Sequence, residues 1–241
     1  MTTLLQDLDV EIQEKAVPSH IAIIMDGCRR WAKRRGLHPT AGHWEGSETL
    51  TGIVRAAAEM GVKTLTVYSF STENWSRSEE EIEDLMNLFE IYLTEKRDLL
   101  IKDGVRLDAI GDLDGLPERV RNALDLTRKA TAHCDKINLV LAVNYGGRDE
   151  IRRALCKMIE KGVKAEDVTE ELISNELDTR LYGDPDLLIR TSGEIRVSNF
   201  LIWQISYAEI YTTEVLWPDF NALMLQEAID EYQSRVRRKG T

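Results

Sequence analysis

The sequence predicts a single α/β domain with an open, mostly parallel, six-stranded sheet flanked by helices. Short apolar runs rich in β-branched residues alternate along the chain with segments of helical length, and such alternation builds right-handed β-α-β units. The runs are almost continuously apolar, which is typical of strands buried on both faces of a parallel sheet. No Pro- or Gly-rich linker interrupts the 241 residues, so one domain accounts for the chain.

The expected elements follow one another in regular order. Strands are predicted over residues 21–25, 64–70, 105–110, 137–143, 186–189 and 200–203, with a further short one over 210–213. Helices are predicted over about residues 42–60, 78–102, 116–133, 147–162, 169–176 and 219–238. Residues 1–17 have no place in this pattern and are expected to form a peripheral arm or helix, which leaves 18–241 as the functional domain.

The helix expected from residue 78 carries an informative pattern. Ser78 followed by Glu81 forms a capping box at its start. An apolar stripe follows at helical spacing, made of Ile82, Leu85, Met86, Leu88, Phe89, Tyr92 and Leu93. Such a stripe either faces only the core or also lines an apolar cleft for a long hydrocarbon, and periodicity does not separate the two.

Composition disfavours several classes of protein. The 42 Asp and Glu residues outnumber the 31 Lys and Arg residues and give a net charge of −11, which disfavours a general nucleic-acid binder or a basic membrane-surface protein. The three cysteines Cys28, Cys134 and Cys156 include no CxxC pair, which argues against a disulfide scaffold or structural zinc and favours a reducing compartment. The chain shows no secretory leader pattern and no run of 18 apolar residues, so we expect a cytosolic enzyme.

The end of the first predicted strand carries the first group of candidate functional residues. Asp26 and Gly27 stand there, where open α/β sheets bind their ligands. Five bases follow within seven residues, against the charge of the whole chain: Arg29, Arg30, Lys33, Arg34 and Arg35. Gly27 permits close approach of a phosphate, and Asp26 could hold a magnesium ion that bridges phosphate oxygens. A solvated basic helix face capped by an aspartate is the plainer alternative.

A second group follows the second predicted strand, between residues 69 and 77. Ser71 and Asn74 can form hydrogen bonds or relay a proton. Trp75 offers an apolar wall, and Arg77 can bind a phosphate through two N–H groups. A polar loop with a hydrophobic anchor is the alternative.

A third group follows the strand predicted at 186–189. Arg190, Arg196 and Ser198 surround a glycine-containing loop and form a second candidate anion cradle. Farther along, Glu209 could complete a metal shell with Asp26, or it could simply pair with an arginine.

Several familiar chemistries lack their residues. The chain has neither G-x-x-x-x-G-K-[ST] nor G-x-G-x-x-G, so a nucleotide-binding loop and a Rossmann dinucleotide site find no support. No G-x-S-x-G nucleophile elbow occurs. Cys28 stands two positions after Asp26 in place of a second acid, which argues against a phosphoaspartate nucleophile. Two anion sites, one metal site and an apolar-lined helix fit the joining of phosphorylated molecules with hydrocarbon tails.

Specific motifs run in order from about His20 to Gly240. They are HIAIIMDG-x-RRWAK, the pair Gly42-His43, YSFSTENWSR, NYGGR at 144–148, DLLIRTSGE, R-x-SNFL-x-WQ-x-SYAE and LWPDF. Together they resemble the cis-prenyltransferase family, with the bacterial undecaprenyl diphosphate synthases as the nearest type. The resemblance implies a homodimer and a hydrophobic tunnel between the sheet and its helices.

The resemblance also implies a reaction and its setting. Isopentenyl diphosphate is added repeatedly to farnesyl diphosphate with Mg²⁺, and the long-chain product, undecaprenyl diphosphate, is the precursor of a lipid carrier for cell-wall synthesis. The implied location is the cytoplasm, with peripheral contact to the inner face of the membrane through the lipid product. No nucleic-acid partner is implied.

Individual roles come from the same resemblance. Asp26 is implied as the essential acid that handles magnesium and diphosphate, Glu209 as a magnesium ligand, and Asn74 as a group that helps to remove a proton. Contacts to the allylic substrate are implied for Gly27, Cys28, Arg29, Arg30, Trp31, His43 and Arg77. Among the remaining implied substrate contacts, Arg190, Arg196 and Ser198 bind isopentenyl diphosphate. The others are Ser71, Thr72, Glu73, Trp75 and Val197. The closing residues 238–240 resemble an R-x-G tail that reaches across the dimer.

Three positions depart from the family pattern. Cys28 stands where the family usually has Asn, Pro39 where a basic residue is common, and Ile195 where some bacterial members carry a magnesium-binding histidine. We therefore expect activity with altered affinity for magnesium or substrate. Cys28 also suggests a reactive thiol of lowered pKa next to the arginines that follow it, against the alternative of an inert small residue.

Two other classes of function stay open at this level. A non-catalytic partner subunit would tend to lose Asp26 and the arginine pairs, which are present. A phosphate-ester hydrolase using Asp26 would release inorganic phosphate. The length of the product depends on the floor of the tunnel and is not encoded in any motif.

Overall fold

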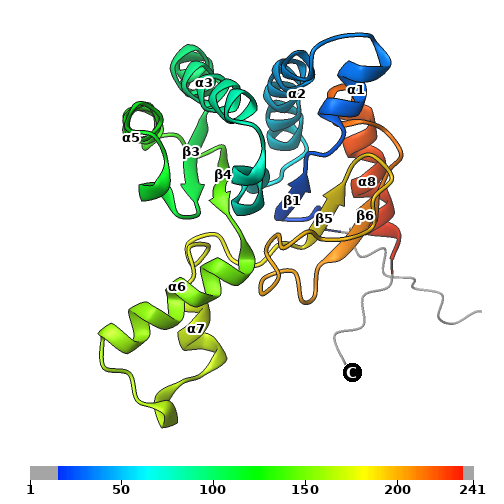
Figure 1. Ribbon diagram of the computed structural model, residues 1–241. Helices are drawn as coiled ribbons and strands as arrows, with labels where there is room; N and C mark the ends of the chain where they lie inside the picture. The colour runs from blue at the N-terminus through cyan, green and yellow to red at the C-terminus, as the bar shows by residue number, and fades with distance from the viewer. Residues whose placement is uncertain (1–15, 236–241) are drawn as a thin grey trace, which may run out of the picture.

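A computed structural model of the chain describes residues 16–235 as a six-stranded sheet with all strands parallel (Figure 1). The strand order is β3-β4-β2-β1-β5-β6. The strands are β1 (His20–Ile24), β2 (Thr64–Ser71), β3 (Val105–Ile110), β4 (Ile137–Tyr145), β5 (Leu187–Arg190) and β6 (Glu209–Thr212). The predicted single α/β domain is confirmed.

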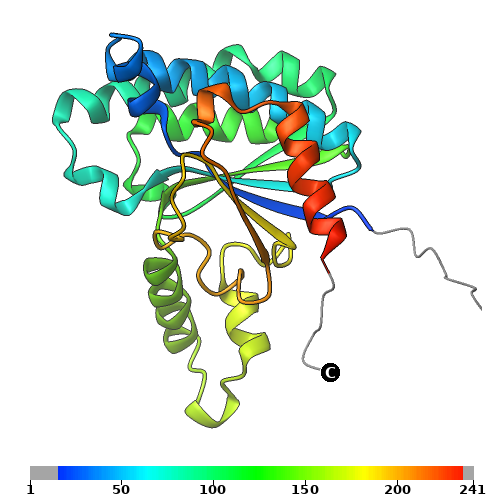
Figure 2. The same ribbon diagram turned by 90° about the vertical axis from the view of Figure 1, so that its right-hand side faces the viewer.

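The helices cover the two faces of the sheet unequally. They are α1 (Cys28–Arg34), α2 (Pro39–Glu59), α3 (Glu79–Glu95), α4 (Arg97–Lys102), α5 (Glu118–Thr131), α6 (Gly147–Glu160), α7 (Glu170–Glu176) and α8 (Ala222–Ser234). Figure 2 shows α2, α3, α5 and α8 on one side of the sheet, where most of the buried apolar side chains gather. On the other side α6 and α7 extend away from the sheet, and a smaller core surrounds Tyr145 and Phe200.

The predicted strand at 200–203 is wrong. Phe200 and Leu201 are fully buried, but they lie in a turn in which Leu201 has a φ of 47°. Their apolar character serves packing on the second face, where the Phe200 ring stacks on Tyr68 at 4.5 Å between centroids. The further candidate at 210–213 is instead the sixth strand, β6.

Two helix predictions are also refined. The helix expected over 78–102 is divided into α3 and α4, which meet at Lys96. The helix α1 was considered only as an alternative for the basic segment after Asp26, because only Cys28 and Ala32 of its residues are buried and its short pattern is dominated by charge.

Two predictions fall on parts of the chain that the structure does not describe. The arm expected over residues 1–17 is described only at residues 16 and 17, and the R-x-G tail at 238–240 lies outside the described residues. Among residues 16–235, no helix combines the length and the apolar character needed to cross a membrane.

Candidate active site

Strand register brings the three predicted groups to one edge of the sheet. β1 lies between β2 and β5, with Ile24 paired to Tyr68 on one side and to Arg190 on the other. Because all strands are parallel, the segments that follow β1, β2 and β5 leave the sheet at the same end. This is the edge at which open α/β sheets bind ligands.

Asp26 and Arg190 form the centre of this edge. Nη2 of Arg190 donates to Oδ2 of Asp26 at 2.9 Å, and the Arg190 side chain is only 5% exposed. Nη2 of Arg30 lies 3.7 Å from the other carboxylate oxygen, Oδ1. The hydroxyl of Thr191 accepts the backbone N–H of Asp26 at 2.9 Å and donates to its carbonyl at 2.7 Å, so the backbone of the acid is held as well.

Arg190 also shapes the loop that follows β5. Its Nη1 donates to Oγ of Ser198 at 2.8 Å and to the backbone carbonyl of Arg196. Its Nε is buried and has no hydrogen-bond partner among residues 16–235. A buried donor without a partner is costly. The Arg196 guanidinium is exposed and paired with Glu194.

An open, cationic pocket of about 710 Å³ lies at the carboxyl end of β1, and we call it the first pocket. Asp26, Arg30 and Arg77 line it. Gly27 has a φ of 110°, and a Cβ there would lie 2.9 Å from the side chain of Leu216, so only glycine fits. The other residues in its lining are Met25, Gly27, Cys28, Arg29, Lys33, Gly36, Leu37, Pro39 and His43.

A smaller apolar cavity of about 160 Å³ lies between the sheet and the helices α2 and α3, and we call it the second cavity. Leu50 of α2 and Leu141 of β4 form part of its wall. The α3 stripe packs in the core and also borders this cavity: Met86 and Leu93 belong to the core and not to the cavity lining, whereas four of the stripe's side chains line the cavity. These four are Leu85, Leu88, Phe89 and Tyr92.

A third pocket of about 570 Å³ lies between the segments that follow β2 and β5. Asp26 belongs to its lining as well as to that of the first pocket, and Met25 and Arg77 line all three spaces. Oδ1 of Asn74 accepts the N–H of Ser71 at 3.0 Å, which fixes the amide at the pocket wall. Its other lining residues are Ile24, Tyr68, Phe70, Ser71, Glu73, Asn74, Arg190, Arg196, Ser198 and Asn199.

Burial decides the charge state of two residues in the first pocket. Burial, with the positive charge of Arg77 beside it, lowers the pKa of His43 to about 4, and Nε2 of His43 has no partner in the described part of the chain. Burial, with Asp26 nearby, raises the pKa of the Cys28 thiol to about 12. The hypothesis of a reactive Cys28 thiol is therefore wrong: desolvation outweighs the arginines that follow it, which are mostly exposed.

Four residues assigned to substrate contacts lie apart from the three spaces. The indole of Trp31 donates to Asp219 at 2.7 Å and stacks under Arg35. Trp75 donates to Asn144 at 2.8 Å and packs against Phe70, so it anchors its segment. Val197 and Thr72 are likewise absent from the pocket linings: Val197 packs on the second-face core, and the Thr72 hydroxyl donates to Glu73 at 3.2 Å.

Glu209 does not join Asp26 within one chain. It pairs in register with Leu187 and through it with Ile21, near the start of the strands, whereas Asp26 follows their carboxyl end. Along the strands, the register position of Glu209 and the end of β1 at Ile24 are three residues apart, which corresponds to about 10 Å. The carboxylate of Glu209 instead accepts from Arg235 at 2.7 Å, which is the alternative considered above.

The residues present still fit magnesium, with Asp26 as the protein ligand. Oδ1 of Asp26 lies 3.7 Å from the Arg30 guanidinium, and Asp26 belongs to the linings of both cationic pockets. Magnesium is usually bound through one or two carboxylates together with substrate phosphates. Among residues 16–235 no cluster of three His, Cys, Asp or Glu side chains could hold a metal alone, so phosphate oxygens would complete the shell.

Some contributors to the site carried no clear signal in the sequence. Thr191 braces Asp26, Ser192 accepts from Arg30, and Tyr68 separates the second cavity from the third pocket. Asn199 hydrogen-bonds to Glu73 at 2.9 Å across the third pocket. All lie within three positions of a predicted residue, but their contacts cross between segments and depend on the strand register.

Comparison with known families gives a match over almost the whole chain. The family model described as "Putative undecaprenyl diphosphate synthase" matches residues 24–240. The isoprenyl transferase of Chlamydia pneumoniae is 47% identical over 232 residues, which are 93% of each chain. That of Fusobacterium nucleatum is 47% identical over 227 residues, or 94% of this chain and 97% of the relative.

Solved structures agree with this family. Lavandulyl diphosphate synthase from Lavandula x intermedia, solved in complex with dimethylallyl diphosphate, has a TM-score of 0.90 and 35% identity, covering 95% of this chain and 100% of that one. A probable undecaprenyl diphosphate synthase from Campylobacter jejuni has a TM-score of 0.80 and 36% identity, covering 94% and 100%.

Proposed function

Because this chain belongs to the undecaprenyl diphosphate synthase family and is a prenyltransferase, we propose that it adds isopentenyl diphosphate repeatedly to farnesyl diphosphate with cis geometry. The proposed product is undecaprenyl diphosphate, the precursor of a lipid carrier for cell-wall synthesis. One observation carries the proposal: two cationic pockets and one apolar cavity meet at Met25 and Arg77.

Each space suits one part of the substrates. The first pocket, with Arg29, Arg30 and Lys33, suits the diphosphate of the allylic substrate, and the adjoining second cavity suits its hydrocarbon tail. The third pocket, with Arg190 and Ser198, suits the diphosphate of isopentenyl diphosphate.

The chain's own groups account for the needs of the reaction. The C–O bond of the allylic diphosphate breaks and its electron pair leaves with diphosphate, while the π electrons of isopentenyl diphosphate form the new C–C bond. A proton then passes to an oxygen of a bound diphosphate, and its C–H bonding pair forms the new double bond. Arginines aimed at the leaving diphosphate stabilise the charge that develops there, the apolar cavity keeps water from the electron-poor carbon, and Asn74 lies at the wall where the proton is lost.

We propose Mg²⁺ as the cofactor, held by Asp26 and by oxygens of the diphosphates. When bound, the ion supplies further positive charge to the leaving diphosphate. Asp26 suits this role because it lines both cationic pockets.

The second cavity is much smaller than the proposed product. Its volume of about 160 Å³ is close to that of an engineered apolar cavity of about 150 Å³ that holds one benzene ring. A growing chain therefore needs the α2 and α3 walls to move apart, and a continuous tunnel belongs to the substrate-bound form of the enzyme. Each buried CH₂ contributes about 0.8 kcal/mol, which favours this opening.

The assembly and location are proposed on the same family membership. We propose a homodimer in which the tail at 238–240 reaches the partner's diphosphate site. We also propose a cytoplasmic enzyme with peripheral contact to the membrane that receives its product.

The proposal is tested by incubating the protein with farnesyl diphosphate, isopentenyl diphosphate and Mg²⁺, followed by chromatography of the products. We expect polyprenyl diphosphates longer than the primer, together with released diphosphate. Asp26→Ala should lower turnover about 100- to 1,000-fold, because it removes the proposed metal ligand and leaves Arg190 without its partner.

The matched control is Asp125→Ala, which removes an exposed aspartate on α5, outside the three spaces. It should keep wild-type turnover. Failure of the wild type to lengthen the primer would overturn the proposal in favour of a non-catalytic partner subunit, and release of inorganic phosphate from simple esters would favour a hydrolase.

A further inference from the structure

Asn199 lies where three segments at the carboxyl edge of the sheet meet. Its Nδ2 donates to Oε1 of Glu73 at 2.9 Å, and its Oδ1 accepts the backbone N–H of Arg148 at 2.9 Å. Its backbone carbonyl accepts the N–H of Gly147 at 2.7 Å. One residue therefore ties the segment after β5 to the segment after β2 and to the first turn of α6.

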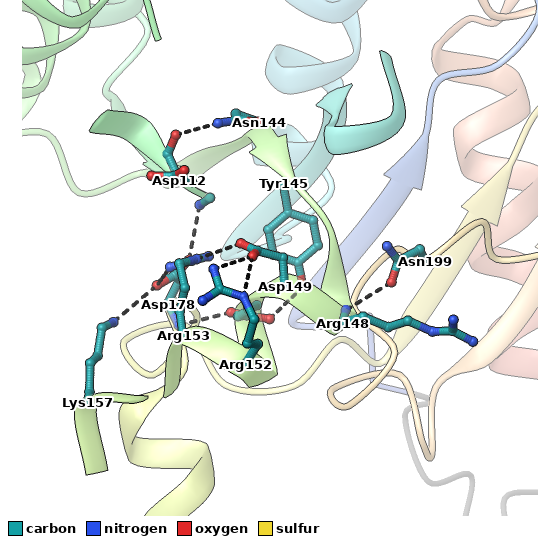
Figure 3. Close-up of polar contacts among 12 residues, drawn as sticks. Asp112, Asn144, Tyr145, Arg148, Asp149, Arg152, Arg153, Lys157, Asp178 and Asn199 are labelled. Atoms are coloured by element: carbon teal, nitrogen blue, oxygen red, sulfur yellow. Dashed lines mark hydrogen bonds and ion pairs between the residues drawn. The ribbon is translucent and has the colours of Figure 1, made fainter. Parts of the chain in front are cut away.

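The α6 side of this junction is firmly held. Arg153 lies between Asp149 and Asp178, with hydrogen bonds of 2.8 Å to the first and 2.6 Å to the second. Figure 3 shows this ion-pair group along α6, with Asn199 facing the backbone of Arg148 at the start of the helix. The N–H that Asn199 accepts thus comes from a fixed element.

The junction has no spare room. A Cβ on Gly146 would lie 2.7 Å from Oγ1 of Thr72 and 2.8 Å from Nδ2 of Asn199. Asn199 itself has a φ of 62°, in the left-handed region that asparagine tolerates better than most residues. Residue type and backbone shape both favour asparagine at this position.

Both segments that Asn199 joins carry walls of the third pocket. Ser198 and Arg196 precede it on the loop after β5, and Asn74 follows Glu73 on the segment after β2. Burial alone would raise the pKa of Glu73, but its hydrogen bonds, led by the one from Asn199, hold that pKa below its usual value. The bond is thus one between a carboxylate and an amide, which is stronger than a neutral pair.

We propose that Asn199 is a positioning residue that sets the distance between the two walls of the third pocket and thereby the affinity for isopentenyl diphosphate. The inference rests on the proposed function, because it takes this pocket as the site of that diphosphate. Asn199 does not need to touch the substrate, since it acts through Ser198 and Asn74.

The test reverses the hydrogen bond. Asn199→Asp keeps the acceptor for Arg148 but places a carboxylate against Glu73, so the dissociation constant for isopentenyl diphosphate, measured by calorimetry, should rise about tenfold. Adding Glu73→Gln restores a bond in the opposite direction, because the glutamine amide donates to the carboxylate introduced at position 199. The affinity of this double variant should return to within about threefold of that of Glu73→Gln alone.

A matched control separates geometry from charge. The double variant N199D/E73M has the same net charge as N199D/E73Q, but methionine cannot donate a hydrogen bond. Only the glutamine variant should recover affinity. Equal recovery in both, or wild-type affinity in Asn199→Asp, would show that the bond does not position the pocket.

A second cycle covers the case in which Asn199→Asp does not fold. Asn199→Ala, Glu73→Ala and their double variant should lose affinity non-additively, with the double variant no weaker than the poorer single one. Additive losses would overturn the inference. A wild type that binds isopentenyl diphosphate but never elongates a primer would count against the proposed function alone, whereas a wild type that does not bind it would reject both.

Discussion

Arg190 in the third pocket is held differently from Arg29 and Arg30 in the first pocket. In the third pocket the Arg190 side chain is 5% exposed and bonded to Asp26 and Ser198. In the first pocket Arg29 and Arg30 are 60% and 44% exposed, and their acidic neighbours among the described residues lie at 3.7 Å or more. A buried, bonded guanidinium is already in place when charge develops, whereas exposed ones adjust and are screened by salt.

This difference matches what the two pockets are proposed to bind. Isopentenyl diphosphate is the same small molecule in every cycle, and a fixed site suits it. The allylic substrate grows by one unit each time, so its diphosphate must be accepted again after each addition. Under the proposed function, the more rigid site binds the constant substrate and the more adaptable site binds the changing one.

The largest expected effect comes from replacing Arg190, the buried arginine of the third pocket. Arg190→Ala should lower turnover about 100- to 1,000-fold, because it removes a buried donor that holds both Asp26 and Ser198. Arg190→Lys should lose nearly as much, since one ammonium cannot reproduce the two-sided geometry of a guanidinium. Steady-state kinetics on both substrates measure the change.

The control for this pair is Arg152→Lys, which alters an exposed arginine on α6 that is paired with Asp149, away from the three spaces. It should be neutral in the same assay. A fully active Arg190→Lys enzyme would mean that a simple positive charge is enough and that the third pocket is no more rigid than the first.

Ionic strength should affect the KM values of the two substrates differently, by a smaller factor than the loss of Arg190. Raising salt from about 0.05 M to about 0.5 M should increase KM for farnesyl diphosphate several-fold more than KM for isopentenyl diphosphate, because exposed charges are screened more than buried ones. Arg30→Ala should reduce this salt dependence and raise the farnesyl KM about tenfold. Equal salt slopes for both substrates would contradict the comparison.

A smaller effect concerns His43, which burial keeps neutral in the first pocket. Its pKa is about 4 in the folded protein and about 6.5 when unfolded, so the unfolded chain binds more protons between these values. The contribution that neutral, buried His43 makes to the free energy of unfolding is therefore fully present above pH 6.5 and is lost as pH falls toward 4. His43→Gln should make the free energy of unfolding less dependent on pH in this window, by at most about 1.4 kcal/mol per pH unit.

Urea unfolding at several pH values gives this measurement. KM for farnesyl diphosphate should show no His43 titration between about pH 5.5 and pH 8, because the pocket's positive charge comes from Arg and Lys. A histidine-dependent step in that range would place a charged imidazole in the pocket.

The smallest expected effect is at Cys28. Its buried thiol, with a pKa of about 12, should resist iodoacetamide in the native protein, whereas the exposed Cys156 should be labelled. Mass spectrometry of peptides after limited labelling distinguishes them, and turnover should be unchanged. Rapid labelling of Cys28 would show that the first pocket opens deeply in solution.

Much of the fold could be predicted from local patterns. The apolar runs located the first four observed strands clearly and offered β5 and β6 as weaker candidates, because burial leaves a mark in the sequence that does not depend on the partner strand. The segment at 200–203 was wrongly predicted as a strand because burial on the second face of the sheet, around Phe200, produces the same apolar signal as a strand. Periodicity reports that a residue is buried and does not report against what.

The site was predictable as a set of segments and not as a set of contacts. The residues after β1, β2 and β5 were expected to converge, since parallel strands end together. Glu209 was a candidate to complete a metal shell with Asp26 or to pair with an arginine, and it lies at the other end of the sheet from Asp26 and pairs with Arg235. Cys28 was judged by its charged neighbours, whereas burial controls its pKa.

The sequence by itself determined the α/β class, the order of its elements and the three charged segments that follow the strands, because propensity, periodicity and motifs act over short stretches of chain. Only the tertiary structure decided that Asp26 meets Arg190, that four of the seven residues of the α3 stripe line a cavity, and that Asn199 joins two walls of one pocket. These contacts join residues separated by more than a hundred positions, or depend on which element packs against which. Register and packing set such distances, and no local pattern carries them.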